Sequence, residues 1–271
     1  MATITVDEAL ERVSVLHALG RFDEAEGLCR KILEFDENNA IALHHLKILI
    51  RIRDDRTKDY LLREALRTLV APFVSPDPII FDVGANVGRM AAVYRKEIFP
   101  NAVMHLFEPA PDLFKFLKEA CSDDTKIVVN DVGVGAEDGV ARFNLIGSDY
   151  GQSSFLSPLE LEGGVGHVDV PVTKIDTYCQ NNGIDLIDFM KLDVQGYEPE
   201  CLRGAEGMLA KGAIKFIQTE IIFDRSYERS CSFYDIEVEI SKYGYRLLSI
   251  ASLWDGVGRP VRSVDAIYAA S

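Results

Sequence analysis

The sequence has no long hydrophobic run. None of its apolar stretches approaches the roughly 18 residues that a membrane-spanning helix needs, so we expect no membrane span. Its start, MATITVDEAL, lacks a basic segment followed by an apolar one, so we expect no secretory signal and a cytoplasmic protein. Basic residues are also scarce: 29 Lys and Arg stand against 43 Asp and Glu, for a net charge of −14. An acidic surface repels phosphate backbones, which disfavours nucleic-acid partners.

Cysteine and histidine are too few and too scattered for a disulfide framework or a metal site. The five cysteines never occur in CxxC spacing, which favours reduced thiols in a cytosolic protein. The five histidines form no HExxH pattern, so they predict no metal ligands. What the chain does have is 48% hydrophobic and 27% charged residues, which is the balance of a folded globular protein.

Helical periodicity marks residues 1–55. Apolar residues recur at helical spacing in Val6–Leu19, Phe22–Phe35 and Ala40–Ile52. The stretch Leu16–Ala42 resembles a tetratricopeptide repeat, with Glu37 where that family usually has proline; the residues at the family's spacing are Leu16, Leu19, Gly20, Phe22, Ala25, Leu33 and Ala42. One repeat cannot bury both of its faces, so it must pack on the rest of the chain, on a protein partner or on a second copy. A plain helical hairpin that caps a larger domain is the alternative.

A helix over Lys58–Val70 and a proline-rich boundary at Ala71–Pro78 follow the helical module. From residue 78 on, short apolar strands alternate with helices, which predicts an α/β fold with a doubly wound, mostly parallel sheet and a ligand site at the strands' carboxyl ends. The expected helices include 87–98, 198–210 and 173–181, the last opened by a capping-box-like pair of Thr173 and Asp176. We therefore divide the chain into a helical module at 1–55, a helix and linker at 56–77, and a domain at 78–271.

A glycine-containing loop, FDVGANVG (81–88), follows the first expected strand. Its glycines lack the GxGxxG spacing of a dinucleotide site, and no GK[ST] of a P-loop follows. The carboxylate of Asp82, at the start of the loop, would repel a pyrophosphate but would suit a ligand with an amino group or a sulfonium. We therefore predict that the loop binds S-adenosylmethionine through Asp82, Gly84, Ala85, Asn86 and Gly88. A purely structural strand–turn–helix is the alternative.

Two further acidic residues follow the next strands. Glu108 ends the second expected strand, 24 residues after Gly84, where a carboxylate can accept hydrogen bonds from ribose hydroxyls. Asp131 follows the third strand, where it could accept from the exocyclic amine of adenine while Val132 lies against the ring. An exposed strand-end glutamate and an Asx turn are the corresponding alternatives.

Six segments carry a family resemblance that spans roughly residues 79–250. In order they are FDVGANVG, FEP, DVGVGAEDG, TKID, KLDVQGYE and IQTE, and together they resemble the FkbM-type class I methyltransferases. KLDVQGYE (191–198) is the most specific piece, although the family often has an acidic residue in place of Gln195. The resemblance implies a seven-stranded Rossmann-like sheet with a reversed last strand, S-adenosylmethionine as the methyl donor, and O-methylation. The family's acceptors include sugars, polyketides and lipids.

Methylation of a hydroxyl needs a group that removes its proton, because the sulfonium already activates the methyl group. We predict Asp193, at the end of the fourth strand, as that base or as a residue that organises the site, and Glu220, at the end of the next strand, as second choice. Glu198 opens a helix, where the helix dipole alone favours a carboxylate. Strand-end carboxylates also suit a divalent cation, but no histidine accompanies them and we assign no metal ligand.

These features predict an S-adenosylmethionine-dependent O-methyltransferase with a small-molecule or glycan acceptor. A sugar hydroxyl is the first choice, because an acidic surface that contains aromatic residues suits neutral polyols better than anions. A polyketide, a lipid or another hydroxylated metabolite is the second. The polar loop Gly147–Ser154 either covers the acceptor or merely connects two elements. The rival class is an interaction protein that binds the cofactor without turnover and is recruited through residues 1–55.

Overall fold

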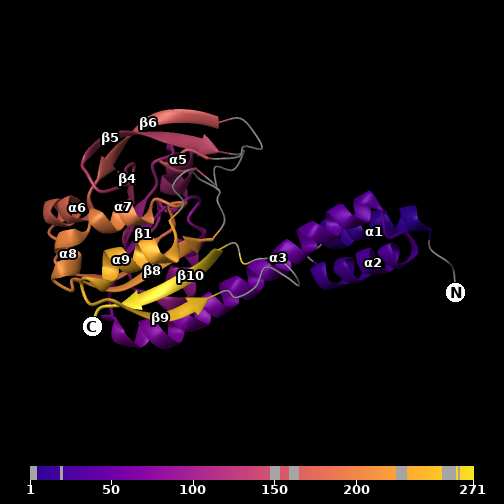
Figure 1. The fold of residues 1–271 in the computed structure, drawn as a ribbon, viewed down its shortest axis with the longest axis horizontal. Coiled ribbons are helices and arrows are strands. Elements are labelled where there is room, and N and C mark those ends of the chain that lie inside the picture. The colour runs from indigo at the N-terminus through magenta and orange to yellow at the C-terminus, as the bar shows by residue number, and fades with distance from the viewer. Residues whose placement is uncertain are drawn as a thin grey trace. The chain divides into compact units, whose positions relative to one another are not determined.

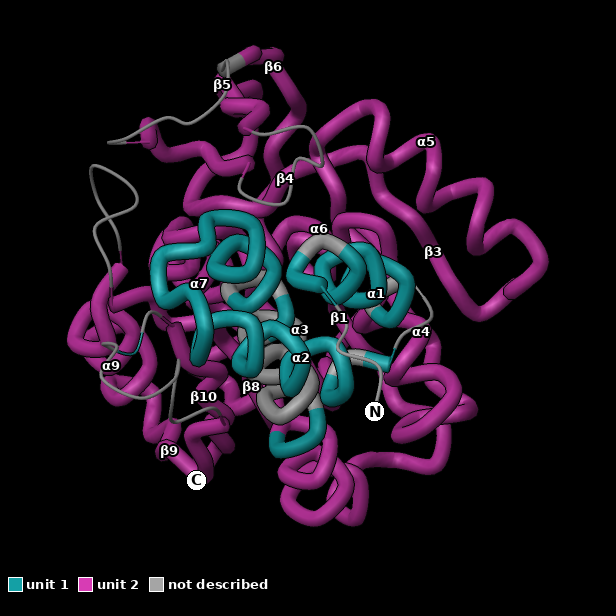
Figure 2. Tube along the Cα trace, turned by 90° about the vertical axis from the view of Figure 1, so that its right-hand side faces the viewer, with its two compact units in different colours: residues 1–61, 254–261 teal, residues 62–253, 262–271 magenta. Residues whose placement is uncertain are grey.

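The computed structural model describes residues 5–18, 21–146, 153–158, 165–223, 231–251, 261 and 263–271. The chain divides into two compact units, the first of residues 1–61 and 254–261 and the larger second of residues 62–253 and 262–271 (Figure 2). Within these described ranges, no helix is both long enough and apolar enough to cross a membrane. The predicted boundaries at residues 55 and 77 remain predictions.

The first unit consists of helices α1 (Val6–Ala18) and α2 (Phe22–Phe35) and the first part of α3 (Ala40–Ala65) (Figure 1). Its core consists of small and branched side chains that the helical periodicity places inward, among them Val13, Ala25, Cys29, Ile32, Ala42 and Leu49. The two helical patterns expected over 40–52 and 58–70 are one helix up to Ala65, because no Gly or Pro interrupts residues 53–57. Leu19 and Gly20 lie outside the described residues, and the repeat-like character of this unit remains a prediction.

The second unit contains a seven-stranded sheet whose strand order is β3-β2-β1-β7-β8-β10-β9. Figure 1 labels β1, β8, β10 and β9 of this sheet. Strands β3, β2, β1, β7 and β8 run parallel, while β10 is antiparallel to both of its neighbours. This arrangement confirms the expected doubly wound α/β sheet with a reversed last strand. The strands are β1 (Ile79–Val83), β2 (Val103–Phe107), β3 (Ile127–Asn130), β7 (Ile187–Leu192), β8 (Ile214–Ile222), β9 (Arg246–Ala251) and β10 (Ser263–Ala269).

The central strands are mostly apolar and largely buried, because both faces of the sheet are covered. Successive residues of β1 point to opposite faces. Ile80 belongs to a core cluster that includes Leu66 and Tyr94 from the helical segments on one side. Phe81 points the other way, where its ring lies 5.6 Å from that of Tyr178 in α6 (Ile175–Asn182). Helical segments thus pack on both faces of the sheet. They hold the strand ends in place.

Several helices differ from the sequence expectation. The capping box predicted at Thr173 and Asp176 is wrong: α6 has no side-chain cap, and Asp176 instead accepts hydrogen bonds from the backbone N–H groups of Gly207 and Met208 in the neighbouring helix. The helix expected over 87–98 is a short α4 (Arg89–Val93) continued by a π-helical turn, Tyr94–Ile98. A π-helical turn, Leu66–Val70, and a 3₁₀ turn, Ala71–Phe73, precede the sheet. Further α-helices among the described residues of the unit are α5 (Pro111–Ala120), α7 (Glu198–Arg203), α8 (Glu206–Ala210) and α9 (Phe233–Ser241).

The helix expected over 198–210 is interrupted between α7 and α8. The break lies at Gly204, where a Cβ atom would come within 2.0 Å of the carbonyl oxygen of Gly135. Gly135 follows β4 (Gly133–Val134), which pairs in a second, three-stranded sheet with β6 (Val165–Thr173) and, through β6, with β5 (Gly139–Ile146). The close approach of this small sheet therefore ends α7 early and requires a glycine there.

A substitution at Gly84 tests the close packing of the strand ends. Gly84 has φ +78°, and a Cβ atom would lie 1.9 Å from the carbonyl oxygen of Asp193. Gly183 is a matched control, because its φ is +65° but no described atom lies within 4 Å of the place that a methyl group would take there. We expect Gly183→Ala to cost about 1–2 kcal/mol of unfolding free energy for its backbone conformation alone. We expect Gly84→Ala to cost about 3 kcal/mol or more, since overpacking adds to that strain. Urea unfolding measures both, and equal losses would contradict this account.

Candidate active site

The carboxyl ends of five parallel strands meet at one edge of the sheet. Strand order reverses between β1 and β7, so this edge holds the topological switch point at which doubly wound folds bind ligands. The registers place the strand ends side by side: Val83 pairs with Phe107 on one neighbour and with Leu192 on the other. The structure thereby brings together the acidic residues that the sequence nominated, which are Asp82, Glu108, Asp131, Asp193 and Glu220.

The loop after β1 folds over the end of β2. The N–H groups of Gly84 and Ala85 both donate to the carbonyl oxygen of Phe107, at 3.1 and 3.0 Å. Asn86 then adopts a left-handed conformation with φ +51°, and Gly88, with φ +79°, precedes α4. These four predicted cofactor residues therefore form one tight turn against the neighbouring strand.

Glu108 is buried beneath that turn. Its Oε2 accepts from the N–H of Asn86 at 2.8 Å, and its Oε1 accepts from the N–H of Ala110 at 2.9 Å. Burial raises the pKa of Glu108 to about 7, although both backbone hydrogen bonds oppose the rise. A carboxylate has about four acceptor positions, so each oxygen keeps one for a ligand hydroxyl.

Asp82 forms a buried ion pair that the sequence analysis missed. It stands opposite Lys191 in the register of β1 and β7, and Lys191 Nζ lies 2.9 Å from Asp82 Oδ1. Burial raises the pKa of Asp82, and Lys191 opposes that rise. Asp82 Oδ2 is buried and has no hydrogen-bond partner among the described residues. A lysine inside the apolar run FMKL was the available signal, because lysine is almost never buried without a partner.

Gln195 connects the two predicted catalytic carboxylates. Its Nε2 donates to Asp193 Oδ1 and to Glu220 Oε2, each at 3.0 Å. Asp193 Oδ2 lies 3.4 Å from Lys191 Nζ, and the Asp193 side chain is 39% exposed. Asp193 is therefore both held by its neighbours and accessible to a ligand.

The turn that carries Asp193 is fixed from two sides. Glu198 Oε1 accepts from the N–H groups of Val194 and Gly196, at 3.0 and 3.2 Å. The buried hydroxyl of Ser154 donates to the carbonyl oxygen of Gln195 at 3.0 Å. Glu198, which opens α7, therefore supports the turn through backbone hydrogen bonds. In the loop Gly147–Ser154, only Ser153 and Ser154 lie within the described residues.

The strand end at Asp131 is more open. Asp131 is exposed and Val132 half-buried, directly beyond β3. Asn130, which the sequence analysis did not single out, donates from Nδ2 to the carbonyl oxygen of Leu106 at 3.0 Å and accepts from the Tyr178 hydroxyl at 3.1 Å. Asn130 thus fixes the end of β3 against β2. The adenine contacts of Asp131 and Val132 remain predictions.

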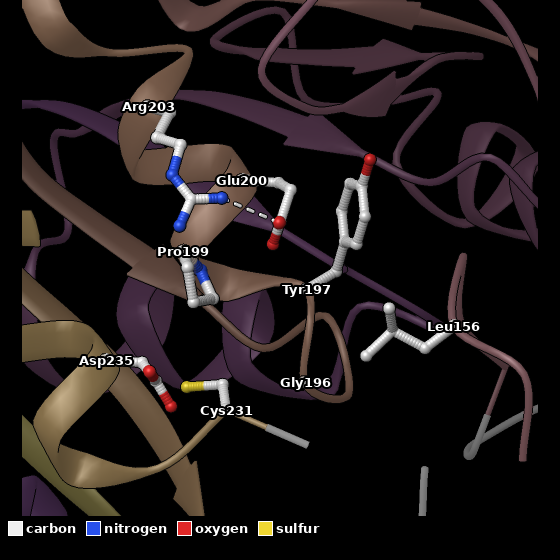
Figure 3. A pocket seen from close by; sticks show the side chains of 8 residues that line it. All are labelled: Leu156, Gly196, Tyr197, Pro199, Glu200, Arg203, Cys231 and Asp235. Atoms are coloured by element: carbon white, nitrogen blue, oxygen red, sulfur yellow. Dashed lines mark hydrogen bonds and ion pairs between the residues drawn. The ribbon is translucent and has the colours of Figure 1, made fainter. Parts of the chain in front are cut away.

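A pocket of about 520 Å³ begins at the turn after Asp193 (Figure 3). Tyr197 and Leu156 line one side of it, and Cys231 and Asp235 lie opposite them in that view. Gly196, Pro199, Glu200 and Arg203 complete the lining. The guanidinium of Arg203 is held by two carboxylates, Glu200 at 2.7 Å and Glu239 at 2.8 Å. The described lining therefore presents an aromatic ring and carboxylates, and its Arg203 is already paired. In the part of the chain that the structure describes, no group of three His, Cys, Asp or Glu could hold a metal ion.

The family model for the methyltransferase FkbM domain matches residues 82–247, more than half of the chain. The chain is 29% identical over 176 residues to the 2-O-methyltransferase NoeI of Sinorhizobium fredii, a match that covers 60% of this chain and 70% of that protein. It is 28% identical over 158 residues to the 31-O-demethyl-FK506 methyltransferase FkbM of Streptomyces tacrolimicus, covering 48% of this chain and 60% of that one.

A further relative is the hexuronic acid methyltransferase AglP of Haloferax volcanii, which is 27% identical over 176 residues. That match covers 63% of this chain and 65% of the relative. Among solved structures, Aeropyrum pernix fibrillarin in complex with natively bound S-adenosyl-L-methionine aligns with a TM-score of 0.46 and 15% identity, over 78% of this chain and 73% of that one. The family match contains every strand end of the site from Asp82 to Glu220. The chain therefore belongs to the methyltransferase FkbM domain family and is an S-adenosylmethionine-dependent methyltransferase.

Proposed function

We propose that this methyltransferase methylates a hydroxyl group of a sugar or of another polyhydroxylated acceptor. One observation carries the proposal. The buried carboxylate of Glu108 and the accessible carboxylate of Asp193 lie at the ends of strands on either side of β1, with the glycine turn between them. That arrangement offers a binding place for the methyl donor at Glu108. Beside it, Asp193 offers a carboxylate that can take up a proton.

The residues of the turn suit S-adenosylmethionine. Glu108 keeps an acceptor position on each oxygen for the ribose hydroxyls, and Asp82 Oδ2, which is buried and has no partner among the described residues, can accept one more hydrogen bond. A ligand amino group would supply that bond. Gly84, Ala85, Asn86 and Gly88 would contact the ligand through the backbone, and Asp131 with Val132 would contact the adenine.

The cofactor, when bound, supplies a methyl group on a sulfonium whose leaving group is a neutral thioether. Asp193 then takes the proton of the acceptor hydroxyl while the hydroxyl oxygen bonds to the methyl carbon. Lys191, 3.4 Å from Asp193 Oδ2, favours the ionised carboxylate that this step needs. Glu220 stands in the same hydrogen-bonded group and is the second choice for the base. The turn fixed by Glu198 and Ser154 keeps the base oriented, which contributes to the rate without chemistry of its own.

The pocket at Tyr197 supports a neutral sugar as the acceptor. Carboxylates such as Glu200 and Asp235 accept hydrogen bonds from sugar hydroxyls, and the ring of Tyr197 offers a surface for the apolar face of a sugar. The cation in the described lining, Arg203, already pairs with two carboxylates, so an acidic sugar would meet a positive charge that is already neutralised. The name of AglP, a hexuronic acid methyltransferase, supports a sugar acceptor in general.

Calorimetry with S-adenosylhomocysteine tests the donor site. We expect binding by the wild type, weakened in Glu108→Gln by about 1–3 kcal/mol, because a charge-assisted hydrogen bond is lost. Affinity should also fall as the pH falls through about 7, since Glu108 takes up a proton there and the ionised form is the better acceptor. Glu119→Gln, an exposed glutamate in α5, should match the wild type. A folded wild type that gives no heat of binding would reject the donor site.

Single-turnover methyl transfer tests the base. We expect Asp193→Asn to lower the rate by about 10²–10⁴-fold with little change in S-adenosylhomocysteine affinity, because an amide cannot take the hydroxyl proton. Glu220→Gln should have a smaller effect. Asp185→Asn, an exposed aspartate just before β7, is the control. An Asp193→Asn variant that transfers methyl groups at the wild-type rate would move the role to Glu220.

A panel of acceptors tests the pocket. With labelled donor, we expect transfer to neutral oligosaccharides to exceed transfer to uronate-containing ones. Glu200→Gln should narrow that preference, because it removes one of the two carboxylates that pair with Arg203. Glu119→Gln again serves as the control. A wild type that prefers uronates would contradict the neutral-sugar assignment but not methyl transfer itself.

A further inference from the structure

We propose that Gln195 is a positioning residue that holds Asp193 and Glu220 at a fixed separation for proton transfer. The inference rests on the proposed function, because it assigns a purpose to the group of side chains around the base. Its geometric basis is independent of the acceptor: one amide nitrogen donates to both carboxylates, each at 3.0 Å.

A neutral donor with two hydrogens matches both of these partners. Both facing atoms are carboxylate oxygens, which accept and do not donate when ionised. The amide nitrogen of glutamine supplies one N–H to each and adds no charge. A glutamate at this position would instead place a third carboxylate against Asp193 and Glu220, which raises the pKa of the group. The amide therefore lets both carboxylates stay ionised side by side.

The backbone at Gln195 strengthens the inference. Its φ is +55°, in the left-handed region where a residue with a side chain is strained and glycine is not. The neighbouring bonds from Ser154 and Glu198 hold the turn in that conformation. Glycine would relieve the strain, so the glutamine side chain at this position lowers the stability of the fold relative to glycine. The two hydrogen bonds of the Gln195 side chain to Asp193 and Glu220 are an interaction that glycine could not make.

The amide of Gln195 forms a bridge of two hydrogen bonds between Asp193 and Glu220. Charged and titratable groups from several elements face this bridge. Lys191 lies beside Asp193 and pairs with Asp82 behind it. Glu198, on the far side of the turn, is buried and bonded to backbone N–H groups, and Asp265 of β10 stands opposite Glu220 in the strand register. The phenol of Tyr94 also lies near the Asp193 charge. A new negative charge at position 195 would act on this set, in which Lys191 is a cation that the described residues supply.

Two substitutions separate positioning from structural support. Gln195→Gly removes the bridge and the backbone strain together, so we expect unchanged or higher resistance to urea but a methyl-transfer rate lowered by about 10–100-fold, with S-adenosylhomocysteine affinity unchanged. Gln195→Glu should be slow near pH 8 and recover part of the lost rate toward pH 6, because protonation restores a donor. Gln180→Glu, an exposed glutamine in α6, is the matched control.

A readout without turnover keeps this proposal distinct from the proposed function. Loss of a donated hydrogen bond should raise the pKa of the Asp193 carboxylate in Gln195→Gly, measured by carboxyl carbon NMR on the free protein. A raised pKa supports the bridge even if the wild type methylates no acceptor, an outcome that would reject only the proposed function. An unchanged pKa of Asp193, or wild-type transfer by Gln195→Gly, would overturn the positioning role.

Discussion

The buried ion pair between Asp82 and Lys191 is the interaction on which the site depends. It joins the two central strands at the point where strand order reverses, and Lys191 also reaches Asp193 and the carbonyl oxygen of Gly84. Removing one partner of such a pair costs about 3–5 kcal/mol, because the other charge stays buried. The ammonium group of Lys191 thereby connects Asp82, the turn that begins at Gly84, and Asp193, the proposed base.

The site divides into two environments with different tasks. On the β2 side, Glu108 is buried and bonded to backbone N–H groups, which suits the recognition of a ligand that remains in place. On the β7 side, the Asp193 carboxylate is partly exposed and contacts an amide and a lysine side chain, which suits a group that must meet changing partners and exchange a proton. The parallel sheet places both environments at one edge because all of its carboxyl strand ends lie there.

The sequence was sufficient to predict where the strands lie and which acidic residues stand at their ends. Short apolar runs such as that around Phe81 or Phe189 are buried on both faces, and their length and β-branched or aromatic content predict strands locally. Helix ends were less predictable. The break at Gly204 depends on the carbonyl of Gly135, and Asp176 caps a helix that is distant in sequence. Both contacts involve residues about 30 or more positions apart, which no local pattern encodes.

By itself, the sequence determined the α/β class, the loop that follows the first strand, and the acidic residues at the strand ends, because periodicity and turn chemistry are local properties. Only the tertiary structure decided which groups those acidic residues meet. The register of β1 with β7 places Lys191 against Asp82, and the left-handed backbone of Gln195 directs its amide between Asp193 and Glu220. Such partners come from strand order and backbone conformation, and those arise only when distant segments pack together.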